Sequence, residues 1–196
     1  MQITNIFLDR DGTIIEDKHY LCSPEKISFI PGALQILRSM VEHGLKIFLV
    51  TNQSGIGRQY FTEFQYFEVH NQLLNLLKQY GIELTGSTYC PHRPDDNCPC
   101  RKPETGMWTA LAEKHKLDCE QSIIIGDKVS DIDMGYNAGF KSGILVLTGH
   151  GKKALSHYNA VYNKDKWYYL RQDQNFPIIA AQDLGDAWNW IRSRYE

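Results

Sequence analysis

The stretch Ile6-Phe7-Leu8-Asp9-Arg10-Asp11-Gly12-Thr13 decides the fold of this chain. Its apolar residues 6–8 predict a short buried strand, and two carboxylates separated by one residue follow it. A carboxylate at the end of a buried strand needs a compensating charge, because an unpaired buried charge costs much free energy. Ligands of open α/β sheets bind at the carboxyl ends of the strands, so Asp9 is well placed to hold a cation and to attack a phosphorus atom. Asp-Gly is also a common turn signal, and this stretch alone leaves both interpretations open.

Three later segments favour the catalytic interpretation. Residues 45–50 form a second apolar strand that leads into Thr51, and residues 122–126 form a third that leads into Asp127. Lys102 stands just before an expected helix. Together the segments supply a nucleophile, an acid/base, a hydrogen-bond donor, a cation and a metal ligand, in the chain order Asp9, Asp11, Thr51, Lys102 and Asp127.

Strands and helices alternate along the chain. The tail also has helical spacing, at Leu184, Ala187, Trp188 and Ile191. The alternation predicts an α/β fold: a Rossmann-like parallel sheet with helices on both faces. The segment between Asp11 and Thr51 is already filled by a helix and a strand, so no large cap domain is expected there. The remaining predicted helices cover residues 31–43, 62–80, 105–115 and 129–138. The remaining strands are a short one that ends at residues 88–89 and one over residues 143–147.

Composition limits the class of protein. The chain has 196 residues, of which 42% are hydrophobic, and we expect a single domain over 1–196. A net charge of −2 with scattered basic residues argues against a nucleic-acid partner. No apolar stretch approaches the roughly 20 residues of a membrane span, and the first strand begins without a signal peptide. We therefore expect a cytoplasmic monomer that acts on a small molecule.

Two short motifs predict a structural zinc site in a loop over residues 90–100. Cys90-Pro91-His92 and Cys98-Pro99-Cys100 each place two ligands one residue apart, and in an extended segment such residues point the same way. Three thiolates and one imidazole suit tetrahedral Zn²⁺ and leave no open position for catalysis. The alternative is a disulfide, which explains neither the histidine nor the odd count of five cysteines. Cys22 and Cys119 have no such partner and are expected to be ordinary core or surface residues.

Over residues 3–151 the chain resembles the haloacid-dehalogenase superfamily of phosphatases. The resemblance rests on Asp9-x-Asp11-Gly12-Thr13, Thr51-Asn52, Lys102 and Gly126-Asp127. With the two zinc motifs and Gly126-Asp127-Lys128, it narrows to the D-glycero-D-manno-heptose 1,7-bisphosphate 7-phosphatases, whose near relatives are the histidinol-phosphate phosphatases. The chain departs from them in a short zinc loop and in an unmatched tail from Lys152.

The resemblance implies a mechanism. Asp9 would form an aspartyl-phosphate, and Asp11 would protonate the leaving sugar oxygen and then activate water. Mg²⁺ would be held by Asp9, the backbone carbonyl of Asp11 and Asp127. Thr51 and Asn52 would donate to the phosphoryl oxygens, and Lys102 would neutralise charge on them. Asp131 has a functional and a structural interpretation, and both stay open. In the functional one it orients Lys128 or contacts a metal-bound water, and in the structural one it serves the amino terminus of a helix.

The resemblance also assigns the substrate-binding residues. Arg101 suits a bidentate contact to a sugar or to a second phosphate, whereas Lys18 also fits a solvated loop. The substrate would be the heptose bisphosphate or histidinol phosphate, with the anomer undecided. A receiver-like phospho-acceptor domain and a zinc-dependent interaction module are alternatives of other classes. The assigned residues are Asp17, Lys18, His19, Tyr20, Thr51, Asn52, Gln53, Ser54, Arg101, Lys102 and Lys128.

Overall fold

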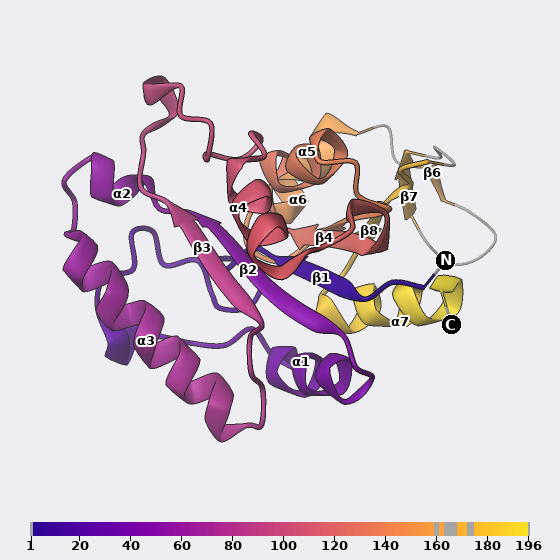
Figure 1. The fold of residues 1–196 in the computed structure, drawn as a ribbon, viewed down its shortest axis with the longest axis horizontal. Coiled ribbons are helices and arrows are strands. Elements are labelled where there is room, and N and C mark those ends of the chain that lie inside the picture. The colour runs from indigo at the N-terminus through magenta and orange to yellow at the C-terminus, as the bar shows by residue number, and fades with distance from the viewer. Residues whose placement is uncertain (1, 159–160, 163–167, 172–174, 196) are drawn as a thin grey trace.

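The computed structural model describes residues 2–158, 161–162, 168–171 and 175–195. Its centre is one eight-stranded sheet in the order β3-β2-β1-β4-β5-β8-β7-β6 (Figure 1). The strands from β3 to β8 in this order pair in parallel, and the last two pairings are antiparallel. The strand bounds are β1 Asn5–Leu8, β2 Lys46–Asn52, β3 Gly86–Cys90, β4 Ser122–Gly126, β5 Ser142–Val146, β6 Val161–Tyr162, β7 Tyr168–Arg171 and β8 Ile178–Ala181.

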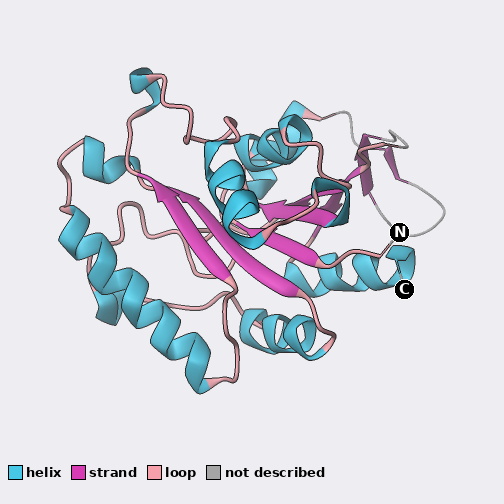
Figure 2. Ribbon diagram, in the orientation of Figure 1, coloured by secondary structure: helices cyan, strands magenta, loops and turns pink. Residues whose placement is uncertain are grey.

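Helices cover both faces of this sheet (Figure 2). Alternate residues of each central strand enter opposite cores, because successive side chains of a strand point to opposite faces. In β1, Ile6 and Leu8 pack with α1, α3 and α7, whereas Phe7 packs with α4, α5 and α6. The helices are α1 Ala33–Glu42, α2 Ser54–Gly57, α3 Glu63–Gln79, α4 Gly106–His115, α5 Val129–Asn137, α6 Gly151–Ala154 and α7 Leu184–Tyr195.

This architecture confirms the predicted α/β fold without a large cap. Residues 12–50 contain only a loop, one short 3-10 turn, α1 and the start of β2. The predicted helices and strands are all present, with ends shifted by one or two residues. The tail helix is also present, and its Trp188 indole donates to Ser39 of α1.

The tail holds a feature that the sequence pattern did not predict. β8 extends the parallel sheet beyond β5, and β7 then turns the edge antiparallel. The β8 residues Ile178–Ala181 form a run of four small or apolar residues, which is too short to distinguish a strand from a helix by periodicity alone.

Among the described residues, no helix is both long and apolar enough to cross a membrane.

The strand order determines where chemistry can occur. β1 lies between β2 and β4, and its first residue, Asn5, pairs with Lys46 of β2 on one side and with Ser122 of β4 on the other. The residues that end these three neighbours therefore meet at one edge of the sheet, which is the usual ligand site of such folds.

Candidate active site

A cavity of about 260 Å³ opens at this carboxyl edge. Three parallel strands and the loops that follow them supply most of its walls. It brings together all the predicted catalytic residues and most of the predicted substrate residues. The lining consists of Asp9, Asp11, Asp17, His19, Tyr20, Leu21, Thr51, Asn52, Gln53, Ser54, Gly55, Arg101, Lys102, Lys128, Ser130 and Asp131.

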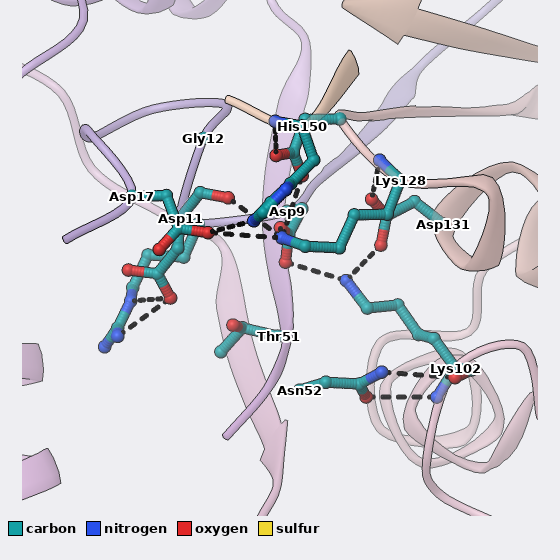
Figure 3. Close-up of polar contacts among 12 residues, drawn as sticks. Asp9, Asp11, Gly12, Asp17, Thr51, Asn52, Lys102, Lys128, Asp131 and His150 are labelled. Atoms are coloured by element: carbon teal, nitrogen blue, oxygen red, sulfur yellow. Dashed lines mark hydrogen bonds and ion pairs between the residues drawn. The ribbon is translucent and has the colours of Figure 1, made fainter. Parts of the chain in front are cut away.

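Lys102 is a buried cation between two buried carboxylates. Its Nζ lies 2.8 Å from Asp9 Oδ1 and 2.6 Å from Asp131 Oδ1, and it donates to the Val50 carbonyl oxygen at 2.8 Å (Figure 3). Burial alone would raise the pKa of Asp9, but the charges of Lys102 and Lys128 outweigh it and hold that pKa below its usual value. Asp9 is therefore an ionised carboxylate at the floor of the cavity.

Asp131 belongs to this ion pair, which settles its contacts. Its Oδ2 accepts the backbone N–H of Lys128 at 2.9 Å and caps the first turn of α5. Its Oδ1 faces Lys102. Asp131 therefore serves the helix amino terminus and orients Lys102. Its hydrogen bond to Lys128 is with the backbone N–H of that residue.

Beside Lys102, oxygen atoms from four residues surround the Lys128 ammonium. Nζ of Lys128 lies 3.0 Å from Asp127 Oδ1, 3.7 Å from Asp9 Oδ2, 3.5 Å from the Asp11 carbonyl oxygen and 3.8 Å from Asp17 Oδ2 at the rim. Burial raises the pKa of Asp127 to about 7, and the charge of Asp9 adds to that rise. The cluster is therefore short of positive charge, and two carboxylates with one carbonyl fit a hard divalent cation such as Mg²⁺. Carboxyl oxygens of Asp9, Asp127 and Asp131 also lie within 4.8 Å of one another, but Asp131 is committed to Lys102.

Asp11 is held by one of its two oxygens. Oδ2 lies 3.1 Å from Nε and 2.9 Å from Nη2 of Arg10, and it also accepts from Nε2 of Gln53 at 2.9 Å. The Arg10 guanidinium is fully buried and lies over the Tyr66 ring. Two hydrogen bonds and one ion-pair contact occupy Oδ2, so Oδ1 is the oxygen of Asp11 that faces no donor from these residues.

Thr51 and Asn52 have different surroundings although they are neighbours on β2. The Thr51 hydroxyl accepts from Gln53 at 2.9 Å, which leaves its own proton to donate into the cavity. The Asn52 carboxamide forms two 3.1 Å hydrogen bonds with the backbone of Lys102. The Asn52 amide therefore positions Lys102, and these two bonds leave one N–H of its NH2 group unused. Donation from Asn52 to a phosphoryl oxygen stays a prediction.

The loop over residues 17–20 lies at the rim, with one exception among its predicted residues. Asp17, His19 and Tyr20 line the cavity. Lys18 does not, because its Nζ donates to the Lys26 carbonyl oxygen at 3.0 Å and lies near Glu16. The expectation that Lys18 binds substrate is not met in this structure.

Close backbone contact holds the floor of the cavity together. A Cβ at Gly12 would lie 2.1 Å from Asp127 Oδ2, and a Cβ at Gly149 would lie 2.6 Å from the Gly12 Cα. Both glycines also have positive φ, a region that other residues avoid. Only glycine allows these two loops to meet over Asp127.

The four predicted zinc ligands lie together at the end of β3. Nδ1 of His92 is 3.6 Å from the Sγ atoms of both Cys90 and Cys100, and the Sγ atoms of Cys98 and Cys100 are 3.0 Å apart. All five cysteines are free thiols, and Cys22 and Cys119 are outside the cluster. Burial raises the pKa of the Cys90 thiol. A bound cation such as tetrahedral Zn²⁺ would favour the thiolate form of this buried ligand.

Two residues that contact the site carboxylates stand out among those that the sequence does not predict. Arg10 stands between the two predicted carboxylates, and only its place in that motif could have pointed to it. His150 reaches Asp17 from a loop far along the chain, and no sequence pattern marks it.

The comparisons with known proteins agree with this geometry. A family model described as HAD-hydrolase-like matches residues 99–166. A probable D-glycero-D-manno-heptose-1,7-bisphosphate 7-phosphatase from Thermoplasma volcanium is 44% identical over 128 residues, or 65% of this chain and 87% of that one. The D-glycero-beta-D-manno-heptose-1,7-bisphosphate 7-phosphatase of Haemophilus influenzae is 40% identical over 150 residues, which cover 74% of this chain and 82% of that one.

A solved structure matches over nearly the whole chain. The D,D-heptose 1.7-bisphosphate phosphatase from B. bronchiseptica, complexed with magnesium and phosphate, has a TM-score of 0.83 and 29% identity, and the match covers 97% of this chain and 99% of that one. Fold and site thus define a haloacid-dehalogenase-like hydrolase. Within that class, the chain belongs to the D-glycero-D-manno-heptose 1,7-bisphosphate 7-phosphatase family.

Proposed function

We propose that this chain is a Mg²⁺-dependent phosphatase that removes the 7-phosphate of D-glycero-D-manno-heptose 1,7-bisphosphate. One observation carries the proposal. Carboxylate oxygens of Asp9 and Asp127 and the carbonyl oxygen of Asp11 all lie 3.0 to 3.7 Å from the same atom, Nζ of Lys128. Relatives that share this family carry the same activity in their names. A receiver domain or a non-catalytic zinc module does not fit membership of that family.

The proposed reaction has two displacements. A carboxylate oxygen of Asp9 attacks phosphorus, the bond to the sugar oxygen breaks, and an aspartyl-phosphate forms. Asp11 delivers the proton to the departing sugar oxygen from Oδ1, because Oδ2 is occupied by Arg10 and Gln53. Asp11 then takes a proton from the water that attacks phosphorus and regenerates Asp9.

The surrounding residues keep the nucleophile charged and the phosphoryl group in place. Asp9, the Asp11 carbonyl and Asp127 would hold Mg²⁺, which neutralises charge between nucleophile and substrate. The positive charge of Lys102, whose Nζ lies 2.8 Å from Asp9 Oδ1, keeps Asp9 ionised. The Thr51 hydroxyl donates to the transferring group.

We further propose that Zn²⁺ at residues 90–100 positions the residues that follow it. The backbone N–H of Arg101 donates to the Cys98 carbonyl oxygen at 3.2 Å, and its Nη1 donates to the His92 carbonyl oxygen at 3.2 Å. Two zinc ligands therefore hold Arg101, and the next residue is Lys102. The free thiols suit the reducing cytoplasm, where we place this protein.

Replacing Cys98 by Ala is expected to remove zinc and to lower kcat, because small errors in the position of Lys102 cost much rate. Metal analysis measures the bound zinc, thermal unfolding measures the loss of stability that follows its removal, and steady-state kinetics measure kcat. Cys119→Ala, outside the cluster, is the control and should keep its zinc. Full activity and an unchanged melting temperature in zinc-free Cys98→Ala would contradict the positioning role.

Substrate selection is proposed for the residues at the rim: Asp17, His19, Tyr20, Gln53, Ser54, Arg101 and Lys128. Phosphate release with Mg²⁺ tests the proposed function on both anomers of the heptose bisphosphate, the matching monophosphates and histidinol phosphate. We expect a heptose bisphosphate to have the highest kcat/KM. A preference for histidinol phosphate would change the assigned substrate and leave the mechanism intact. One continuous sheet carries every proposed catalytic strand end, so we propose that the chain acts as a single domain.

Arg101→Ala is expected to lower kcat/KM for the bisphosphate more than for a small phosphoester. The side chain lines the cavity and suits a bidentate contact to the second phosphate or to a sugar hydroxyl. Steady-state kinetics on both substrates measure the ratio. Arg93→Ala, in the same loop and paired with Asp96, is the control. Equal losses on both substrates would instead place Arg101 at the reacting phosphoryl group.

A further inference from the structure

A loop after β5 is fastened to the floor of the active site through its backbone. The Thr148 hydroxyl donates to the Gly12 carbonyl oxygen at 2.6 Å. The backbone N–H of His150 donates to Asp127 Oδ2 at 2.8 Å. Together with the close approach of Gly149 to Gly12, these contacts fix where the His150 side chain begins.

From this fixed point the His150 ring reaches the rim of the cavity. Its Nε2 lies 3.0 Å from Asp17 Oδ2, and Figure 3 shows the ring directed at that carboxylate. The other oxygen of Asp17, Oδ1, accepts the backbone N–H of His19 at 2.9 Å. Asp17 is thus held at both oxygens, and its side chain is only 18% exposed.

The anchored Asp17 carboxylate differs in chemistry from the other polar groups of the cavity. The other walls of the cavity supply the cations of Arg101, Lys102 and Lys128, which suit phosphate groups. A carboxylate repels phosphate and only accepts hydrogen bonds. It has about four lone-pair sites. His150 and His19 contact it, and the Lys128 Nζ lies 3.8 Å from its Oδ2, which still leaves at least one site available to a hydroxyl donor.

We propose that His150 is a positioning residue for sugar recognition: it holds Asp17 so that this carboxylate accepts hydrogen bonds from sugar hydroxyls beside the transferred phosphate. This inference rests on the proposed function. His150 acts through Asp17 and does not touch the reacting atoms. His150→Ala and His150→Gln both keep the backbone N–H that contacts Asp127, so the effect of the imidazole can be measured separately.

A double-mutant cycle tests the inference. His150→Ala, Asp17→Ala and the double variant are compared with the wild type on the heptose bisphosphate and on phenyl phosphate, which has no sugar hydroxyl. In the wild-type background we expect His150→Ala to raise KM for the bisphosphate about tenfold, the scale of one hydrogen bond to a charged group, with a smaller change in kcat. In the Asp17→Ala background the same substitution should change KM less than about twofold. His150→Gln, whose amide can donate to Asp17, should restore most of the KM.

Controls and adverse results are distinct. Lys152→Ala, an exposed residue two positions further on, should match the wild type. Additive losses in the cycle, or equal losses on phenyl phosphate, would overturn the role of His150. A wild type that does not prefer the bisphosphate to phenyl phosphate would overturn the proposed function instead. The cycle would then be run on the best sugar phosphate, where coupling of His150 to Asp17 still decides the inference.

Discussion

Asp9→Asn is expected to abolish phosphate release while the protein folds and keeps its zinc cluster. The substitution removes the nucleophile but keeps the size of the side chain. Loss of the covalent nucleophile in other hydrolases costs on the order of 10⁶-fold in kcat. Single-turnover and steady-state phosphate release measure the loss, and thermal unfolding with metal analysis shows that the fold remains.

A second measurement links the loss to the covalent intermediate. Beryllofluoride with Mg²⁺ imitates an aspartyl-phosphate, so it should bind the wild type tightly and Asp9→Asn not at all. Asp95→Asn makes the same change on an exposed carboxylate and should behave as the wild type. Substantial turnover by Asp9→Asn would remove the nucleophile assignment, and with it the two-step reaction.

Lys102→Met is expected to lose both activity and stability. The ammonium lies 2.8 Å from Asp9 and 2.6 Å from Asp131, and its removal leaves buried carboxylates without their cation. Breaking a buried ion pair in this way costs roughly 3–5 kcal/mol of unfolding free energy. Chemical denaturation measures the stability, and phosphate release measures the activity.

Adding Asp131→Asn to Lys102→Met separates the two losses. The neutral amide can still accept the Lys128 N–H at the start of α5 but no longer needs a cation. Most of the stability should return, whereas turnover should not, since Asp9 has still lost its partner. Lys153→Met, on an exposed lysine, is the control. Recovery of turnover in the double variant would show that Lys102 serves the fold and not the reaction.

The sequence was most informative where a local pattern carries the information. Apolar runs placed β1, β2 and β4, and topology alone then required Asp9, Thr51 and Asp127 to meet at one edge. The two short cysteine motifs likewise placed four ligands within reach of one ion. In these cases neighbouring residues, or the carboxyl ends of parallel strands, determine the geometry.

Contacts between side chains far apart in the sequence were beyond such reasoning. The commitment of Asn52 to the backbone of Lys102 joins residues 50 positions apart. The pairing of Asp131 with Lys102 depends on how α5 docks, and the sequence left two roles for that carboxylate open. Lys18 was expected at the cavity because the family resemblance assigns its whole loop to substrate binding, but in an irregular loop adjacent side chains point in different directions.

The strand β8 limits how far this chain can be shortened. It occupies the side of β5 that would otherwise be the border of the parallel sheet, and its residues 178–181 are all buried. A chain cut back to residues 3–151, the part with the family motifs, would retain every proposed catalytic residue and still present a bare row of unpaired N–H and C=O groups along Ser142–Val146. Strands exposed in this way pair with those of other molecules, so we expect such a fragment to self-associate. We therefore expect the tail to protect the part of the chain with the family motifs from self-association.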